Sequence, residues 1–199
     1  MFITFEGGDG GGKTTQIRLL RDRLEQAGRA VVLTREPGGT PEAEKIRRLI
    51  LERDGGDWSP QAETLLMFAA RQMHVRDLIA PALAAGRTVL CDRFTDSTRA
   101  YQGYAGGMDL AAIETLKKLA IGDLEPSRTI ILDLPPEIGL ARSRSGAAEG
   151  MQEAKGLEFQ TRLREGYLAI ARANPERCIV IDATGSVDDV AAAIWKALT

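Results

Sequence analysis

Five short apolar runs, rich in β-branched residues, alternate along the chain with longer segments of helical periodicity. The runs are FITF (2–5), AVVLT (30–34), TVLCD (88–92), TIILDL (129–134) and CIVID (178–182). The segments predicted as helices are 14–27, 41–53, 60–85, 109–121, 137–144, 157–173 and 187–198. Such alternation is typical of a parallel sheet covered by helices on both faces. The pattern therefore predicts a three-layer α/β fold with a five-stranded parallel sheet.

The chain has 199 residues, which suits one domain, so we expect residues 1–199 to form a single domain. One stretch stands apart from the strands and helices. Residues 143–156, SRSGAAEGMQEAKG, are small and polar, contain glycines and lie between two helical patterns. We predict that they form a mobile loop or lid.

Composition limits the partners and the compartment. The formal net charge of −2 gives no overall field for nucleic acid, so we expect no nucleic-acid partner. We expect no membrane partner either, because no apolar run reaches 18 residues and MFITFEGG lacks the basic start of a signal peptide. Cys91 and Cys178 lie far apart in apolar runs and are expected to be buried, reduced thiols of a cytoplasmic protein. His74, the one histidine, lies in a helical pattern and is interpreted as a packing or helix-surface residue.

A glycine-rich segment, GGDGGGKTT (7–15), follows the first predicted strand and precedes a helix. Gly7, Gly12, Lys13 and Thr14 satisfy the pattern G-x-x-x-x-G-K-[ST], the P-loop of nucleotide-binding proteins. In that motif glycine N–H groups surround phosphates, the lysine reaches the terminal phosphates and the hydroxyl joins the Mg²⁺ shell. The residues predicted to bind ATP are Gly7, Gly8, Asp9, Gly10, Gly11, Gly12, Lys13, Thr14 and Thr15. A flexible turn is the alternative interpretation.

The P-loop alone does not identify the class of nucleotide enzyme. The guanine-reading motif N-K-x-D of GTPases does not occur in the sequence. Motor and AAA-type ATPases usually carry a strand that ends in paired acids, whereas the third predicted strand ends in Asp92 and Arg93. Asp92 is predicted to hold Mg²⁺ with Thr14, and Arg93 is placed to bind a second anion.

Three arginines are candidates for that second anion. Arg35 and Arg93 stand at strand ends, and ligands bind at the carboxyl ends of strands in such sheets. Arg71 shares a helix face with Met67 and Phe68. Arginines that bind phosphate in a bidentate manner, beside an apolar surface, suit a nucleoside monophosphate. The competing interpretation pairs each arginine with a surface carboxylate.

Several longer stretches make the chain resemble the bacterial thymidylate kinase family over nearly its whole length. They are FEGGDGGGKTT, LTREPGGTP, LLMFAARQMH, VLCDRFTDSTRAYQGY and LDLPPEIGLAR. The resemblance implies a P-loop NTPase fold, phosphorylation of dTMP to dTDP by ATP with Mg²⁺, and a homodimer formed through packed helices. The helices at 60–85 and 95–121 are apolar enough for that contact. A kinase for another acceptor, or a P-loop relative with weak or no transfer activity, is the alternative.

The resemblance also implies roles for matching positions. Arg93 and Arg35 would hold the acceptor phosphate, and Asp9 would orient the sugar and the metal shell. Arg71 would face the base and Phe68 would stack on it, although the aromatic residue of the family lies one position earlier, where this chain has Met67. The residues expected to read base and sugar are Ser97, Thr98, Tyr101 and Gln102, and Tyr101 would disfavour a 2′-hydroxyl.

The acceptor phosphate is largely ionised at neutral pH, because its second pKa is about 6, so no general base is required. Catalysis is then expected from positioning and charge neutralisation by Lys13, Mg²⁺ and arginines. Family members carry a catalytic arginine in the P-loop or in a basic lid. Here the P-loop has none, and residues 149–153 read EGMQE where Asp-Arg-x-Glu is usual. We therefore assign that role to Arg142 and Arg144, the competing hypothesis being a slow enzyme with altered lid chemistry.

Overall fold

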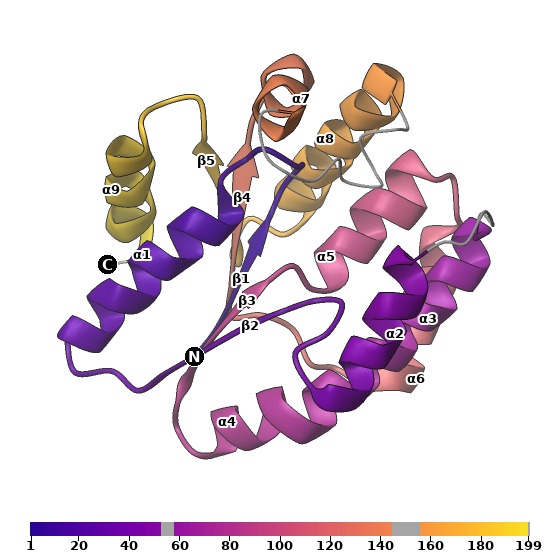
Figure 1. Cartoon of the computed structure of the whole chain (residues 1–199), viewed down its shortest axis with the longest axis horizontal. Coiled ribbons are helices and arrows are strands. Elements are labelled where there is room, and N and C mark those ends of the chain that lie inside the picture. Colours follow the sequence, from indigo (N-terminus) through magenta and orange to yellow (C-terminus); the bar gives the residue numbers. More distant parts are fainter. Residues whose placement is uncertain (53–57, 145–155, 199) are drawn as a thin grey trace.

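Five parallel strands form one sheet in the order β2-β3-β1-β4-β5 (Figure 1). The computed structural model describes residues 1–52, 58–144 and 156–198. The strands are β1 (Phe2–Glu6), β2 (Val31–Arg35), β3 (Thr88–Asp92), β4 (Arg128–Asp133) and β5 (Cys178–Asp182). Each strand lies within one residue of its predicted position, and the predicted three-layer α/β fold is confirmed.

Helices cover both faces of the sheet. The helices are α1 (Lys13–Gln26), α2 (Pro41–Leu51), α3 (Pro60–His74), α4 (Ala80–Ala84), α5 (Thr95–Thr98), α6 (Leu110–Ile121), α7 (Pro136–Arg144), α8 (Gly156–Ala173) and α9 (Val187–Leu198). Helices α1 and α9 lie together on one face, and α8 and α4 pack on the other (Figure 1). None of the described helices is both long and apolar enough to cross a membrane.

Alternation along β1 divides the core between the two faces. Ile3 and Phe5 are fully buried on the side of α1 and α9. Phe2 packs on the opposite side with α4, as expected for a strand whose successive side chains point to opposite faces. Thr4 and Glu6 therefore share the face of Phe2, and both are polar side chains with no exposed surface.

Two helical segments have wider turns than the periodicity predicts. The predicted helix 60–85 is continuous, but residues Val75–Ile79 (η1) form a π-helical stretch between α3 and α4. A second one, Arg99–Ala105 (η2), continues α5. Such segments interrupt α-helices frequently at functional sites, and η2 contains Tyr101 and Gln102.

Candidate functional site

The glycine loop (residues 7–12) joins β1 to α1 and folds back over Lys13. The Lys13 Nζ donates to the carbonyl oxygens of Gly7 at 3.1 Å and Gly8 at 2.8 Å. Gly10 has φ 75°, and a Cβ there would lie 2.3 Å from the carbonyl oxygen of Gly139, so only glycine fits. Helix α1 begins after Gly12 without a side-chain cap, which leaves its first N–H groups available to an anion.

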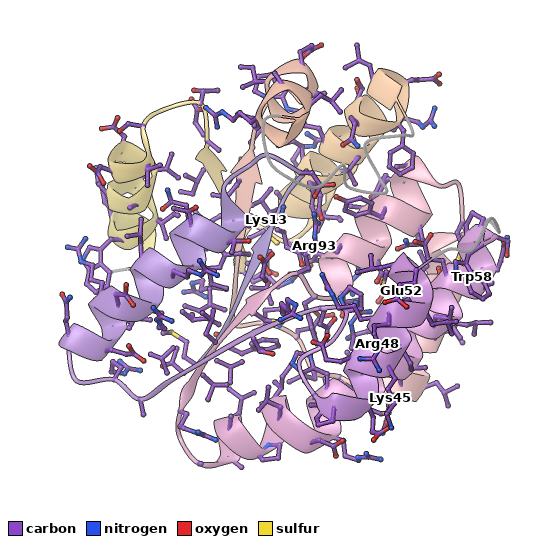
Figure 2. All side chains as sticks on the ribbon, viewed as in Figure 1. Lys13, Lys45, Arg48, Glu52, Trp58 and Arg93 are labelled. Carbon is purple, nitrogen blue, oxygen red and sulfur yellow. The ribbon has the colours of Figure 1, made fainter. Side chains whose placement is uncertain are left out.

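Lys13 and Arg93 place two positive charges close to this loop (Figure 2). Burial and, to a lesser extent, the charge of Arg93 lower the pKa of Lys13 to about 8, against the opposing charges of Asp9, Asp92 and Glu6. An anion bound between the two cations would relieve their repulsion and restore the pKa of Lys13. The electrostatics therefore favour a negatively charged ligand at the loop.

Thr14 and Asp92 meet at the same end of the sheet. The Thr14 Oγ1 donates to the Asp92 Oδ2 at 3.1 Å. A hydroxyl and a carboxylate are the hard oxygen ligands that Mg²⁺ prefers, and Mg²⁺ commonly takes only one or two protein ligands beside phosphate and water. This pair fits the predicted Mg²⁺ site.

Arg93 follows β3 and is held in one orientation. Its φ of 70° is unusual for a residue with a side chain. Its Nη2 donates to Asp9 Oδ1 at 2.7 Å and to the Tyr101 hydroxyl at 3.0 Å. Its Nη1 donates to Ser97 Oγ at 3.2 Å, and the guanidinium carbon lies 4.9 Å from the Tyr101 ring centre. The fold thus fixes this cation beside the glycine loop.

A cleft of about 640 Å³ connects the glycine loop to the segments that follow β2 and β3. Most of the predicted site residues line it together: Asp9, Gly10, Gly12, Lys13, Thr14, Thr15, Arg35, Arg71, Asp92, Arg93, Ser97, Thr98, Tyr101 and Gln102. Gly7 and Gly8 line a small neighbouring cavity of about 30 Å³, and Gly11 is buried within the loop. One cleft therefore joins the predicted donor and acceptor residues.

Arg71 lies in the wall of the cleft with a side chain only 2% exposed. Its Nε donates to Glu36 at 2.6 Å, and its Nη2 donates to the Phe94 carbonyl and to Thr98 Oγ1, each at 3.1 Å. Within the described chain its Nη1 has no hydrogen-bond partner. A buried donor of this kind is costly unless a ligand accepts from it. Arg71 thus offers a hydrogen bond to an acceptor atom of a bound molecule.

The structure separates Phe68 from the cleft, contrary to its predicted stacking role. Phe68 is 3% exposed and its ring lies 4.8 Å from the guanidinium carbon of Arg71, on which it packs. Met67 lines the cleft instead. The reason is helical geometry: one residue along α3 rotates a side chain by about 100°, which turns Phe68 into the core.

Arg142 of α7 does not line the cleft. Arg142 donates to the carbonyl oxygens of Ala183 at 3.0 Å and Thr184 at 3.3 Å, in the segment that follows β5. The described residues that line the cleft do not include it. The main chain of Arg144 ends α7. Most of the predicted lid, residues 145–155, lies outside the described residues, so the predicted role of these arginines stays a prediction.

Several residues near the site were not predicted, and some of them are ionisable. Arg47 of α2 lines the cleft and donates to the Pro37 carbonyl at 2.7 Å. Burial lowers the pKa of Arg47, and the charge of Arg35 lowers it further. A signal for Arg47 existed, since it lies three residues before the buried Ile50 on the same helix face. Glu36 lines the cleft and pairs with Arg71, whereas Glu6 is fully buried beside Ser97. Both lie in stretches that carry the family resemblance, but neither was assigned a role.

Comparison with known proteins agrees with this geometry. The family model described as thymidylate kinase matches residues 5–194. The thymidylate kinase of Caulobacter vibrioides is 53% identical over 193 residues, covering 97% of this chain and 93% of that protein. That of Rhodopseudomonas palustris is 55% identical and covers 99% of this chain and 87% of that protein.

A solved structure is also similar. The crystal structure of thymidylate kinase from Ehrlichia chaffeensis superposes with a TM-score of 0.81 at 40% identity, covering 100% of this chain and 97% of that one. The match extends over the parallel sheet, its flanking helices and the P-loop. The chain belongs to the thymidylate kinase family.

Proposed function

We propose that this protein transfers the terminal phosphate of ATP to dTMP and forms dTDP. The observation that carries the proposal is the cleft, which joins a P-loop to a second group of cations. That group, the acceptor arginines, consists of Arg35, Arg47 and Arg93. Family membership supports dTMP as the acceptor, and the unpartnered Nη1 of Arg71 supplies a donor for a carbonyl oxygen of its base.

The donor end of the cleft would bind the phosphates of ATP. The uncapped start of α1 and the glycine N–H groups would surround them, and Lys13 would contribute the charge. Thr14 and Asp92 would hold Mg²⁺, which when bound neutralises phosphate charge during transfer. Asp9, held by Arg93 at 2.7 Å, stands between the two ends.

The acceptor needs no general base, because a phosphate oxygen of dTMP attacks and this group is largely ionised at neutral pH. The residues therefore act by position and charge. Arg93 would orient the acceptor phosphate, since its guanidinium is fixed by Asp9, Ser97 and Tyr101. Tyr101, whose ring lies below that guanidinium, would pack under the sugar and disfavour a 2′-hydroxyl.

The test is ADP formation from ATP and Mg²⁺ with dTMP, dUMP, UMP, CMP, AMP or thymidine supplied singly. We expect the highest kcat/KM with dTMP, a lower value with dUMP and no transfer to thymidine, which lacks the acceptor phosphate. A preference for another monophosphate would refute dTMP as the substrate. Tight dTMP binding without ADP formation would instead support a binding protein without transfer activity.

We propose in addition that the protein is a cytoplasmic homodimer. Leu65 of α3 and Leu119 of α6 are 56% and 84% exposed, and these two helices pack together. We assign the subunit contact to these two helices, each of which exposes a large apolar side chain. Both cysteines are free and buried, in keeping with a reducing compartment. Light scattering on the protein and on Leu119→Glu tests the dimer, and a monomeric parent protein would refute it.

A further inference from the structure

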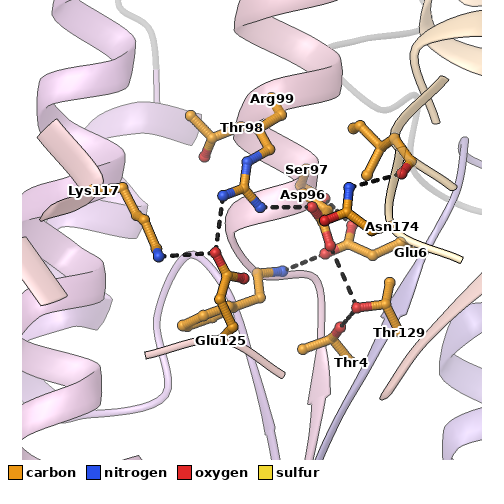
Figure 3. A network of polar contacts seen from close by, with 12 residues as sticks. Thr4, Glu6, Asp96, Ser97, Thr98, Arg99, Lys117, Glu125, Thr129 and Asn174 are labelled. Atoms are coloured by element: carbon orange, nitrogen blue, oxygen red, sulfur yellow. Dashed lines mark hydrogen bonds and ion pairs between the residues drawn. The ribbon is translucent and has the colours of Figure 1, made fainter. Parts of the chain in front are cut away.

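Glu6 ends β1 and has no exposed surface, yet it takes no part in the proposed chemistry. Its carboxylate lies beside Ser97 and Asp96 (Figure 3). One oxygen, Oε1, accepts from the main-chain N–H of Phe94 at 2.7 Å. The other, Oε2, accepts from Ser97 Oγ at 2.5 Å and from the Tyr167 hydroxyl at 3.1 Å.

The same two hydroxyls also contact Arg93. Its Nη1 donates to Ser97 Oγ at 3.2 Å and to the Tyr167 hydroxyl at 3.3 Å. A hydroxyl has one proton and two lone pairs. When both protons point to the Glu6 carboxylate, the lone pairs are left for the guanidinium. A neutral group in place of that carboxylate would allow the protons to turn toward Arg93, where they would oppose its Nη1–H group.

Glu6 also supports the main chain at Arg93. That residue has φ 70°, a conformation that persists only where the surroundings hold it. Two hydrogen bonds flank it, from Arg93 N to the Phe5 carbonyl at 2.9 Å and from Phe94 N to Glu6 Oε1 at 2.7 Å. Adjacent residues of β1 therefore fix both peptide groups of the turn.

We propose that Glu6 is a positioning residue, which orients Arg93 toward the acceptor phosphate through Ser97, Tyr167 and the Phe94 peptide group. The inference rests on the proposed function, because it takes the phosphate of dTMP as the group that Arg93 binds. It goes beyond that function because it assigns the orientation of the Arg93 guanidinium to a buried carboxylate that does not contact the substrate.

The experiment compares dTMP with thymidine, which differ in the phosphate, by calorimetric binding to Glu6→Gln at about pH 8. Gln keeps the volume of Glu and removes the charge. We expect the preference for dTMP over thymidine to fall about tenfold, the size of one charge-assisted hydrogen bond, with thymidine affinity and the KM for ATP unchanged. In kinetics the KM for dTMP rises accordingly.

Thr4→Val is the matched control. Thr4 is buried on the same face of β1, and its Oγ1 lies 3.0 Å from Thr129 Oγ1 (Figure 3). This variant should retain the full preference for dTMP. A Glu6→Gln protein that folds and also retains that preference would overturn the proposal.

A second variant decides the question if Glu6→Gln does not fold. Tyr167→Phe removes one of the two oriented hydroxyls and leaves the carboxylate with its Ser97 and Phe94 partners. We expect a partial loss of the preference, about threefold, and no loss would overturn the proposal. A wild-type protein that binds thymidine as tightly as dTMP would instead refute the proposed function, so the two failures are distinguishable.

A pH series adds a readout that a purely structural role would not alter. Burial and, to a lesser extent, the charge of Asp96 raise the pKa of Glu6 to about 7, against the opposing effects of Ser97, Arg93 and the Phe94 N–H. The other titratable groups that interact with it are Lys13 of α1, Cys91 of β3, Tyr101 of η2, Tyr167 of α8 and Cys178 of β5. Between about pH 8 and pH 6, wild-type preference for dTMP should fall more than that of Glu6→Gln, which shares the other titrating groups and lacks only this carboxylate. Parallel curves would contradict the role of the carboxylate.

Discussion

Replacing Glu36 with Gln removes the one carboxylate that the described chain places on the buried guanidinium of Arg71. The side chains of Glu36 and Arg71 are 3% and 2% exposed, and their 2.6 Å contact is an ion pair without solvent. The other Glu36 oxygen lies 3.0 Å from His74 Nδ1. Gln keeps the volume, so no cavity forms, and the loss arises from the charge left buried. Breaking such a pair costs about 3–5 kcal/mol.

The control is an exposed pair of the same residue types. Glu158 and Arg162 of α8 are 87% and 45% exposed, and Glu158→Gln should cost only about 0.3–0.5 kcal/mol. Urea unfolding of both variants and the wild type at neutral pH gives the two free energies. A loss below about 1 kcal/mol for Glu36→Gln would refute the reasoning, because it would mean that Arg71 does not depend on this carboxylate for compensation.

Three further predictions concern the loop, the network and the cleft. In Gly10→Ala the new Cβ would meet a carbonyl oxygen at 2.3 Å, so this variant should have a higher KM for ATP and a lower melting temperature. Both changes should be larger than in the control Gly86→Ala, where φ is similarly positive but no atom lies within 4 Å. Burial raises the pKa of Asp96, but two arginines outweigh it and hold that pKa below 3.8. Stability from Asp96 is therefore present above about pH 4 and lost as pH falls further. Urea midpoints should therefore fall more in the wild type than in Asp96→Asn. Arg47→Ala should raise the KM for dTMP about tenfold, whereas the exposed neighbour Arg48→Ala should leave it unchanged.

The strands and the glycine loop were predictable because their signals are local. Each strand is a short apolar run, and the loop pattern spans residues 7–14. The π-helical turns of η1 and η2 could not be predicted, because a helical pattern of period 3.6 does not show where one turn widens. Met67 and Phe68 illustrate the limit: both are apolar residues on α3, and only packing decides which one faces the cleft.

The residues behind the site depend on distant partners. Glu6 accepts hydrogen bonds from Phe94, Ser97 and Tyr167, which lie 88, 91 and 161 positions away. His74 was interpreted as a packing or surface residue; it is fully buried, with Nε2 2.7 Å from Thr34 Oγ1. No spacing in the sequence encodes these contacts, because they form only when separate elements meet at one edge of the sheet.

The pairing of β1 with β3 sets the spacing between the two segments that bear the proposed donor and acceptor residues. The glycine loop leaves the end of β1 and Arg93 follows β3, and these strands are neighbours in register, with Phe5 opposite Asp92. Neighbouring strands are about 4.8 Å apart. The main-chain hydrogen bonds of the sheet therefore set the spacing between the glycine loop and the segment that carries Arg93. Substitutions of cleft side chains leave this main-chain spacing unchanged, so they are expected to alter how each nucleotide is held rather than the spacing of the two segments that hold them.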